Sequence, residues 1–218
     1  MARKQKITNM KALSELAKNF KTDKGLGLHE YTEVYDDYFD KIKNDKMNFL
    51  EIGVFTGESL KMWEAYLPNS TIIGLDINPG CAQYAGGRRK VYIGSQTDEV
   101  LLYTACKENT PISVIIDDGS HNWDHQIITF RAAFPLLKPG GLYFIEDLHT
   151  SYAGNWAGGT QTGVEFLKGL VDDVMLNGKS FMGTQEIHNQ PLSYFEHHME
   201  YIHFYKSLCV IKKRETAL

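Results

Sequence analysis

The amino-acid sequence predicts an α/β fold with a doubly wound, mostly parallel sheet of seven strands that ends in a C-terminal antiparallel hairpin. From residue 47 onward, apolar stretches of strand length alternate with segments of helical spacing, the pattern of a parallel sheet with helices on both faces. Glycine or acidic residues directly follow several of these strands. The 218 residues, of which 43% are hydrophobic, suffice for one compact core.

Two helices are expected before the first strand. The first is indicated by apolar residues at helical spacing, Leu13, Leu16, Ala17 and Phe20. The second is expected over residues 32–42, after a loop at residues 22–28. We predict that residues 1–45 form a helical segment packed on a core formed by residues 46–218, in a single domain overall.

The strictly alternating part of the chain follows. Short apolar segments rich in β-branched residues predict strands at residues 47–52, 71–76, 91–93, 112–117 and 142–145. Segments of helical spacing between them predict helices at residues 59–66, 98–108 and 125–134. The last helix is expected to close at Lys138-Pro139-Gly140-Gly141. This order gives a Rossmann-like sheet.

The C-terminal part departs from this alternation. Residues 148–163 are rich in glycine, serine, threonine and aromatic residues, which indicates a long functional loop or lid. A helix is expected over residues 162–176. Two strands around Tyr205-Lys206-Ser207, within residues 200–213, predict the terminal hairpin.

Composition and charge disfavour several classes of protein. A net charge of −4 disfavours nucleic-acid binding, and the basic clusters at residues 88–90 and 212–214 are interpreted as solvated surface. No apolar run is long enough for a bilayer, and the first residues lack the pattern of a secretory signal. Three scattered cysteines disfavour a disulfide framework. We expect a cytoplasmic protein that binds neither nucleic acid nor membrane.

The loop after the first core strand predicts a cofactor site. Gly53 and Gly57 allow the backbone to turn sharply and approach a ligand closely before Ser59 opens the next helix. Glu51 and Glu58 flank this loop, where they would repel the pyrophosphate of a dinucleotide. S-adenosyl-L-methionine carries an ammonium group and a cationic sulfur, so these carboxylates favour it as the cofactor.

Polar residues after the next two strands fit the same cofactor. Asp76 ends one strand, where its carboxylate can accept the two ribose hydroxyls of an adenosine. Gln96 lies in a polar turn after the following strand, where an adenine is expected. Taken singly, each motif is also common in a tight loop that only connects a strand to the next element. Their order at successive strand ends favours a nucleoside cofactor.

Two pairs of carboxylates predict a metal site. Asp117 and Asp118 end one strand, and Glu146 and Asp147 follow the next, at the same edge of the sheet. Crowded anions repel one another unless a cation lies between them, and an all-oxygen set suits Mg²⁺ or Mn²⁺ better than zinc. The alternative is that these residues cap turns with no metal.

His121 is the candidate general base. It lies three residues after Asp118, where it can take a proton from a hydroxyl that a metal polarises. The alternative is that it only hydrogen-bonds its own turn. His125, His149 and His188 are further candidates for the pocket, whereas His197 and His198 are expected on the surface.

Four segments carry a resemblance to a known family: FLEIGVFTGESLKMW, IIGLDINPG, IDDGSHNWDH and FPLLKPGGLYFIEDLHTSY. They resemble the metal-dependent, class I sugar O-methyltransferases that act on deoxysugars of macrolide antibiotics, of the mycinamicin and tylosin type. The upstream segment FKTDKGLGLHEYTEVYDDYF extends the resemblance over residues 20–152. These enzymes have a large N-terminal region without a counterpart in this sequence, so acceptor specificity and oligomer contacts transfer least.

The resemblance implies a role for particular residues. It implies Asp118, Glu146 and Asp147 as magnesium ligands and His121 as the general base. Together with the loop described above, it gives the expected cofactor-binding residues, which are Lys24, His29, Tyr31, Thr32, Glu51, Gly53, Gly57, Ser59, Asp76, Gln96 and Asp117. The expected substrate-binding residues are His149, Tyr152 and Trp156. It also suggests a homo-oligomer.

The resulting hypothesis is a Mg²⁺-dependent methyl transfer from S-adenosyl-L-methionine to a sugar hydroxyl, in a deoxyhexose such as rhamnose within a glycoside or glycan. A catechol-type or other small-molecule O-methyltransferase is one alternative, because a planar diol would also chelate the metal. A non-catalytic module that binds the cofactor is another.

Overall fold

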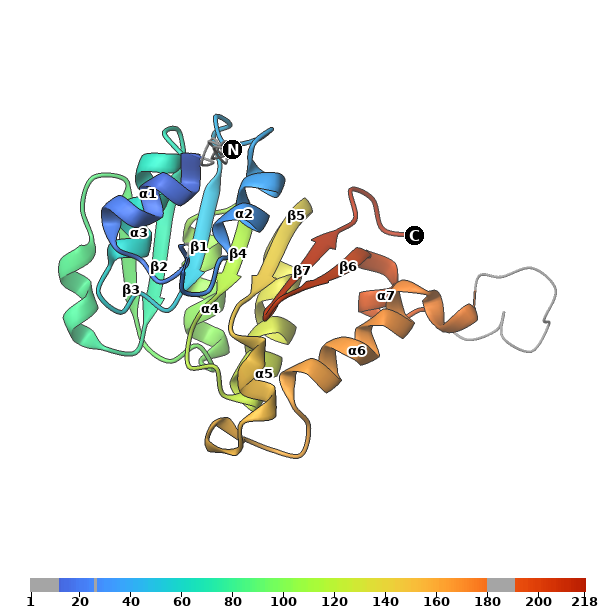
Figure 1. Cartoon of the computed structure of the whole chain (residues 1–218). Helices are drawn as coiled ribbons and strands as arrows, with labels where there is room; N and C mark the ends of the chain where they lie inside the picture. The colour runs from blue at the N-terminus through green and yellow to red at the C-terminus, as the bar shows by residue number, and fades with distance from the viewer. Residues whose placement is uncertain (1–11, 26, 180–190) are drawn as a thin grey trace, which may run out of the picture.

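The computed structural model describes residues 12–25, 27–179 and 191–218 and contains a seven-stranded sheet of order β3-β2-β1-β4-β5-β7-β6 (Figure 1). The strands are β1 (Asn48–Ile52), β2 (Thr71–Asp76), β3 (Arg89–Ile93), β4 (Ile112–Asp117), β5 (Leu137–Ile145), β6 (Met199–Tyr205) and β7 (Leu208–Lys213). The first five are parallel, whereas β7 runs antiparallel to both β5 and β6. The predicted fold class, including its C-terminal hairpin, is confirmed.

Helices cover both faces of the sheet, and each face has its own core. One side carries α1 (Ala12–Phe20), α2 (Thr32–Phe39) and α3 (Glu58–Tyr66), and the other carries α4 (Glu99–Glu108), α5 (Trp123–Ala133) and α6 (Gly163–Val174). A short α7 (Tyr194–His198) precedes the hairpin. Successive strand residues alternate between the cores, as in Phe49 and Leu50 of β1. None of the described helices is both long and apolar enough for a membrane span.

Helix α1 packs on α2 and α3, which brings the N-terminal helices against the α3 side of the sheet. Trp63 is fully buried beneath them, with Tyr35, Phe39 and Phe49 around its ring. The loop between α1 and α2 is thereby held over the carboxyl ends of β1 and β4. The division of the chain at residue 45 stays a prediction.

The main differences from the prediction lie at β5, at the end of α2 and in residues 148–163, while several other ends differ by one or two residues. Strand β5 begins at Leu137, which pairs with Ile112, and the register shifts before Leu142, so the expected turn at residues 138–141 is a bulge inside the strand. Helix α2 ends at Phe39, three residues before the predicted end. The expected loop over residues 148–163 contains two 3₁₀ helices, Leu148–Tyr152 and Gly154–Trp156.

The interpretation of both basic clusters as solvated surface is wrong for two of their residues. The guanidinium of Arg88 donates to the carbonyl of Leu67 at 2.7 Å and also contacts the carbonyls of Glu64 and Ser70, so it caps the end of α3. Lys213 is buried, and its ammonium donates to the carbonyl of Leu137 at 2.7 Å. Unpaired carbonyls at the ends of helical turns attract these cations.

Candidate active site

A cavity of about 460 Å³ opens at the carboxyl ends of β1, β2 and β4, as expected for an open α/β sheet. Gly53, Asp76, Gln96, Asp118, His121 and Asp147 are among its lining residues. Gly53 has φ +94°, and a Cβ at this position would collide with the carbonyl of Asp118. The glycine therefore allows the loops after β1 and β4 to meet beneath the cavity.

Replacing Gly53 with alanine is expected to lower the free energy of unfolding by about 1–3 kcal/mol for the left-handed backbone alone. The collision of the new Cβ with the carbonyl of Asp118 adds to this loss. Gly169→Ala is the matched control: Gly169 lies inside α6 with open space around it. That change should stabilise the protein by about 0.5–1 kcal/mol. Urea unfolding measures both. Equal effects of the two substitutions would contradict this account of Gly53.

Asp76 fastens the loop after β1 to the end of β2. One carboxylate oxygen accepts the backbone N–H groups of Val54 and Phe55 at 2.8 and 2.9 Å, and the other accepts that of Asn78 at 2.8 Å. Partial burial alone would raise the pKa of Asp76, but these backbone donors hold it below its usual value. Asp76 is therefore a carboxylate at the cavity, with lone pairs left for a ligand hydroxyl.

Gln96 joins three elements beneath the cavity. Its amide nitrogen donates to Asp117 at 3.1 Å and to the hydroxyl of Thr129 at 3.0 Å, while its amide oxygen accepts the backbone N–H of Ser120 at 2.7 Å. Asp117 is buried, which raises its pKa to about 7, and one of its oxygens has no hydrogen-bond partner in the part of the chain that the structure describes. Gln96 thus holds the turn that carries Asp118 and His121.

Glu51 is fully buried and does not line this cavity. Its carboxylate accepts hydrogen bonds from the hydroxyl of Ser59 at 2.8 Å and from the indole N–H of Trp63 at 3.1 Å. Burial raises the pKa of Glu51 to about 7, against the opposing effect of the Lys24 ammonium. Gly57, at φ +75°, directly precedes α3 and brings Ser59 to Glu51.

Lys24 is the cation in the middle of the acidic cluster. Its side chain has no exposed surface, and its ammonium contacts Asp118, donates to Glu146 at 2.9 Å and lies 3.6 Å from Glu51. Burial alone would lower the pKa of Lys24, but Asp118, Glu146 and Glu51 raise it well above its usual value. The carboxylates of Glu51 within β1, of Asp118 after β4 and of Glu146 after β5 therefore share one permanent counter-ion.

Glu146 faces the interior. Besides the bond from Lys24, it accepts the hydroxyl of Tyr35 at 2.5 Å, and burial raises its pKa well above the usual value. The parallel register pairs Asp117 with Ile145, so Asp118 and Glu146 follow on the same side of the sheet, where Lys24 reaches both. Asp147 comes next and has a left-handed backbone, with φ +56°. The chain therefore turns at this residue and does not continue in the direction of the strand.

Asp147 is surrounded by donors that face the cavity rim. The hydroxyl of Tyr31 donates to its carboxylate at 2.7 Å. Ring nitrogens of three histidines lie near the same carboxylate: His29 at 3.3 Å, His121 at 3.5 Å and His149 at 3.9 Å. Asp147 is thus the point where the residues after β5, the α1–α2 loop and the turn after β4 converge.

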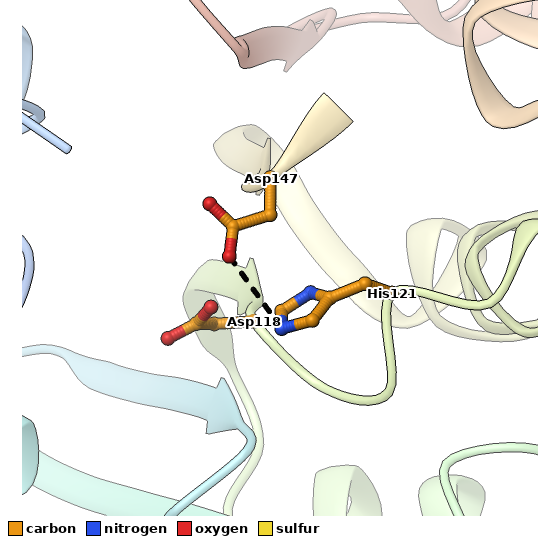
Figure 2. Close-up of side chains that lie close together, drawn as sticks. All are labelled: Asp118, His121 and Asp147. Atoms are coloured by element: carbon orange, nitrogen blue, oxygen red, sulfur yellow. Dashed lines mark ion pairs between the residues drawn. The ribbon is translucent and has the colours of Figure 1, made fainter. Parts of the chain in front are cut away.

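Asp118, His121 and Asp147 are the described residues that could hold a metal ion together (Figure 2). One ligand atom of each lies within 4.8 Å of the others, and the imidazole of His121 points toward Asp147. Two carboxylates beside an imidazole suit a hard divalent cation with water completing its shell. Nδ1 of His121 is buried and has no hydrogen-bond partner among the described residues, so no hydrogen bond of this nitrogen within its own turn holds the ring.

A second cavity, of about 390 Å³, lies on the other side of Asp147. Most of its lining side chains are apolar or aromatic: Leu28, Tyr31, Leu148, Tyr152, Val164, Phe204 and Tyr205. His29, His149, Lys206 and Ser207 complete the wall. The candidate metal group thus lines the first cavity, and Asp147 adjoins the second through Tyr31, His29 and His149. The hairpin turn was predicted from the sequence, but its place in the wall of the second cavity was not.

The structure brings some of the predicted site residues together and leaves others apart. Thr32 is fully buried, bonded to Ser14 at 2.8 Å, and lines neither cavity. Tyr152 is exposed at the second cavity, and the ring of Trp156 lies 5.6 Å from that of His121. Candidate His188 lies outside the described residues. Tyr35 was missed, because nothing near it in the sequence marks its contact with Glu146.

Comparison with known proteins identifies the relatives of this chain. Demethylmacrocin O-methyltransferase of Streptomyces fradiae is 33% identical over 211 residues, which cover 92% of this chain and 53% of that protein. Mycinamicin VI 2''-O-methyltransferase of Micromonospora griseorubida is 32% identical over 219 residues, 92% of this chain and 52% of that protein. No family model matches the sequence.

A solved structure is similar to this chain in the same way. The MycE methyltransferase of mycinamicin biosynthesis, in complex with Mg, SAH and mycinamicin VI, has a TM-score of 0.81 at 30% identity, over 94% of this chain and 55% of that one. Over this shared part, the chain belongs to the macrolide sugar O-methyltransferase family. The chain spans about half the length of these family members, 52–55% in the three compared here.

Proposed function

We propose that this protein transfers a methyl group from S-adenosyl-L-methionine to a sugar hydroxyl, with Mg²⁺ bound beside the reacting oxygen. The observation that carries the proposal is the group formed by Asp118, His121 and Asp147, which lines the first cavity and adjoins the second through the contacts of Asp147 with Tyr31, His29 and His149. The first cavity would hold the cofactor and the second the acceptor, so their reacting atoms would meet at this group.

The first cavity suits an adenosine. Asp76 offers a carboxylate for ribose hydroxyls, and the rim carries the exposed apolar side chains of Phe55 and Ile77. A bound base would cover these side chains and remove apolar surface from water. Asp118 lies at the other end of the same cavity, where its carboxylate would favour the cationic methionine end of the cofactor.

The metal would be held by Asp118 and Asp147, with Glu146 behind them in the same cluster. A divalent cation lowers the pKa of an oxygen that it binds and holds a vicinal diol in place. The imidazole of His121 is then the base that accepts the hydroxyl proton at a ring nitrogen. The oxygen, so activated, attacks the methyl carbon of the sulfonium, and the thioether leaves.

The acceptor class follows from the second cavity and from the relatives. Aromatic rings such as those of Tyr31, Phe204 and Tyr205 suit the apolar faces of a deoxysugar or its aglycone. The relatives include enzymes named for a rhamnosyl tetracenomycin and for mycinamicin VI. We therefore propose a deoxyhexose such as rhamnose, within a glycoside, as the methyl acceptor.

Metal removal tests this proposal. Methyl transfer from labelled S-adenosyl-L-methionine to rhamnosides should fall to background in a chelator and return on addition of Mg²⁺ or Mn²⁺. Asp118→Asn and Asp147→Asn should remain inactive at any metal concentration, whereas the surface variant Asp40→Asn should behave like the wild type. Transfer that persists in chelator would refute the metal's role, and a catechol methylated in preference to any glycoside would change the acceptor class.

Two further features of the working protein are proposed. A reducing compartment such as the cytoplasm suits its three cysteines, which are all buried and unpaired. The family resemblance supports a homo-oligomer, which sedimentation of the purified protein would test.

A further inference from the structure

The turn of the β6–β7 hairpin reaches back to the candidate active site through Ser207. The carbonyl of Ser207 accepts the backbone N–H of Leu148 at 3.0 Å and the hydroxyl of Tyr31 at 3.3 Å. The Ser207 hydroxyl accepts the backbone N–H of His149 at 3.0 Å and lies 2.7 Å from Nδ1 of the same residue. Ser207 therefore ties the hairpin to both segments that surround Asp147.

The backbone alone does not account for a serine here. Ser207 has φ +62°, in the left-handed region that glycine occupies with least strain. Glycine would keep the two hydrogen bonds that this carbonyl accepts, since residue 207 takes part in them only through its main chain. What glycine would lose is the hydroxyl, and both contacts of that hydroxyl go to His149.

The hydroxyl also favours one tautomer of the neutral His149 ring. Its oxygen already accepts the backbone N–H of His149, and its second contact among the described residues is Nδ1 of the same ring. When the hydroxyl donates its hydrogen to Nδ1, a neutral imidazole carries its own proton on Nε2. Nδ1 lies 3.9 Å from Asp147, too far for a competing hydrogen bond.

We propose that Ser207 is a positioning residue that presents His149 as an Nε2–H donor in the second cavity. The donor is matched to an ether or hydroxyl oxygen of the acceptor glycoside, so this inference rests on the proposed function. The ring of His29 lies nearly parallel to that of His149, with centroids 6.1 Å apart, on the same wall of the second cavity. The hairpin turn thus contributes to acceptor recognition without touching the first cavity.

Kinetics of Ser207→Gly test the proposal. The variant should keep its thermal midpoint, because glycine suits this backbone, while KM for the acceptor rises about tenfold and KM for S-adenosyl-L-methionine is unchanged. Ser207→Thr keeps the hydroxyl but strains the left-handed backbone, so it should retain most of the acceptor affinity while its thermal midpoint falls. His149→Gln should raise KM similarly, and the double variant should not be additive. An unchanged acceptor KM in Ser207→Gly would overturn the proposal.

Long-range nitrogen–proton NMR of the histidine rings separates this inference from the enzymatic activity. In the wild type without substrate, the ring of His149, assigned by comparison with His149→Gln, should carry its proton on Nε2, and Ser207→Gly should lose this preference. A proton on Nδ1 in the wild type would overturn the inference. If the Nε2–H form is present but no glycoside is methylated, the proposed function is refuted. The hydrogen bond from Ser207 to His149 is still supported in that case.

Discussion

Replacing His121 with alanine is expected to lower kcat for methyl transfer by about 10²- to 10⁴-fold, the usual contribution of general acid–base catalysis. The imidazole lies 3.5 Å from Asp147 and lines the first cavity, and no other described histidine belongs to the candidate metal group. Cofactor affinity should be nearly unchanged, because the ribose end is held elsewhere. Single-turnover transfer and calorimetric titration with S-adenosyl-L-methionine measure the two quantities.

The backbone at His121 requires a second variant. This residue has φ +56°, where asparagine is better tolerated than alanine, so His121→Asn separates loss of the imidazole from strain in the turn. His197→Ala, on α7 and outside the lining of both cavities, is the control and should retain full turnover. If either His121 variant keeps turnover within about threefold of the wild type, His121 is not the base.

Replacing Lys24 with methionine is expected to lower the free energy of unfolding by about 3–5 kcal/mol, the effect of removing one partner from a buried ion pair. Methionine fills a similar volume but leaves Asp118, Glu146 and Glu51 without their shared cation. Urea unfolding at neutral pH measures the loss. Lys168→Met, which removes an exposed partner of Glu165 on α6, should leave stability unchanged within error.

The loss should depend on pH in a defined direction. Burial raises the pKa of Glu146 well above its usual value even beside Lys24, and the variant lacks the opposing cation. A buried carboxylate with a raised pKa destabilises the fold while it is ionised, and protonation removes that cost. The difference between wild type and Lys24→Met should therefore shrink between about pH 8 and about pH 5. A difference that grows on acidification would contradict the assigned role of Lys24.

Much of the fold could be predicted because it depends on local patterns. Strands β2 and β4 lie at the predicted residues, since continuous apolar runs bounded by polar turns predict buried parallel strands well. Strand β5 was predicted too short, because its bulge contains proline and two glycines, which resemble a turn when only the sequence is considered. Pairing across the sheet, and not local preference, decides that boundary.

The candidate site was predictable as an edge of the sheet but not as a set of contacts. Topology places every strand-end carboxylate at one rim, so Asp118 and Asp147 were found together. The partners of those carboxylates come from distant segments: Lys24 lies 94 residues before Asp118, and Tyr35 lies 111 residues before Glu146. Their contacts depend on how α1 and α2 pack on the sheet, which no short sequence pattern specifies.

The antiparallel position of β7 has a consequence for how such enzymes diversify. It returns the last strands to the carboxyl edge, so the turn at residues 204–207 lines the second cavity but contributes nothing to the first. If the second cavity takes the acceptor as proposed, mutations in this short surface turn, where insertions are well tolerated, would change the acceptor without altering the first cavity. Exchanging hairpin turns between family members would then change which glycoside is methylated.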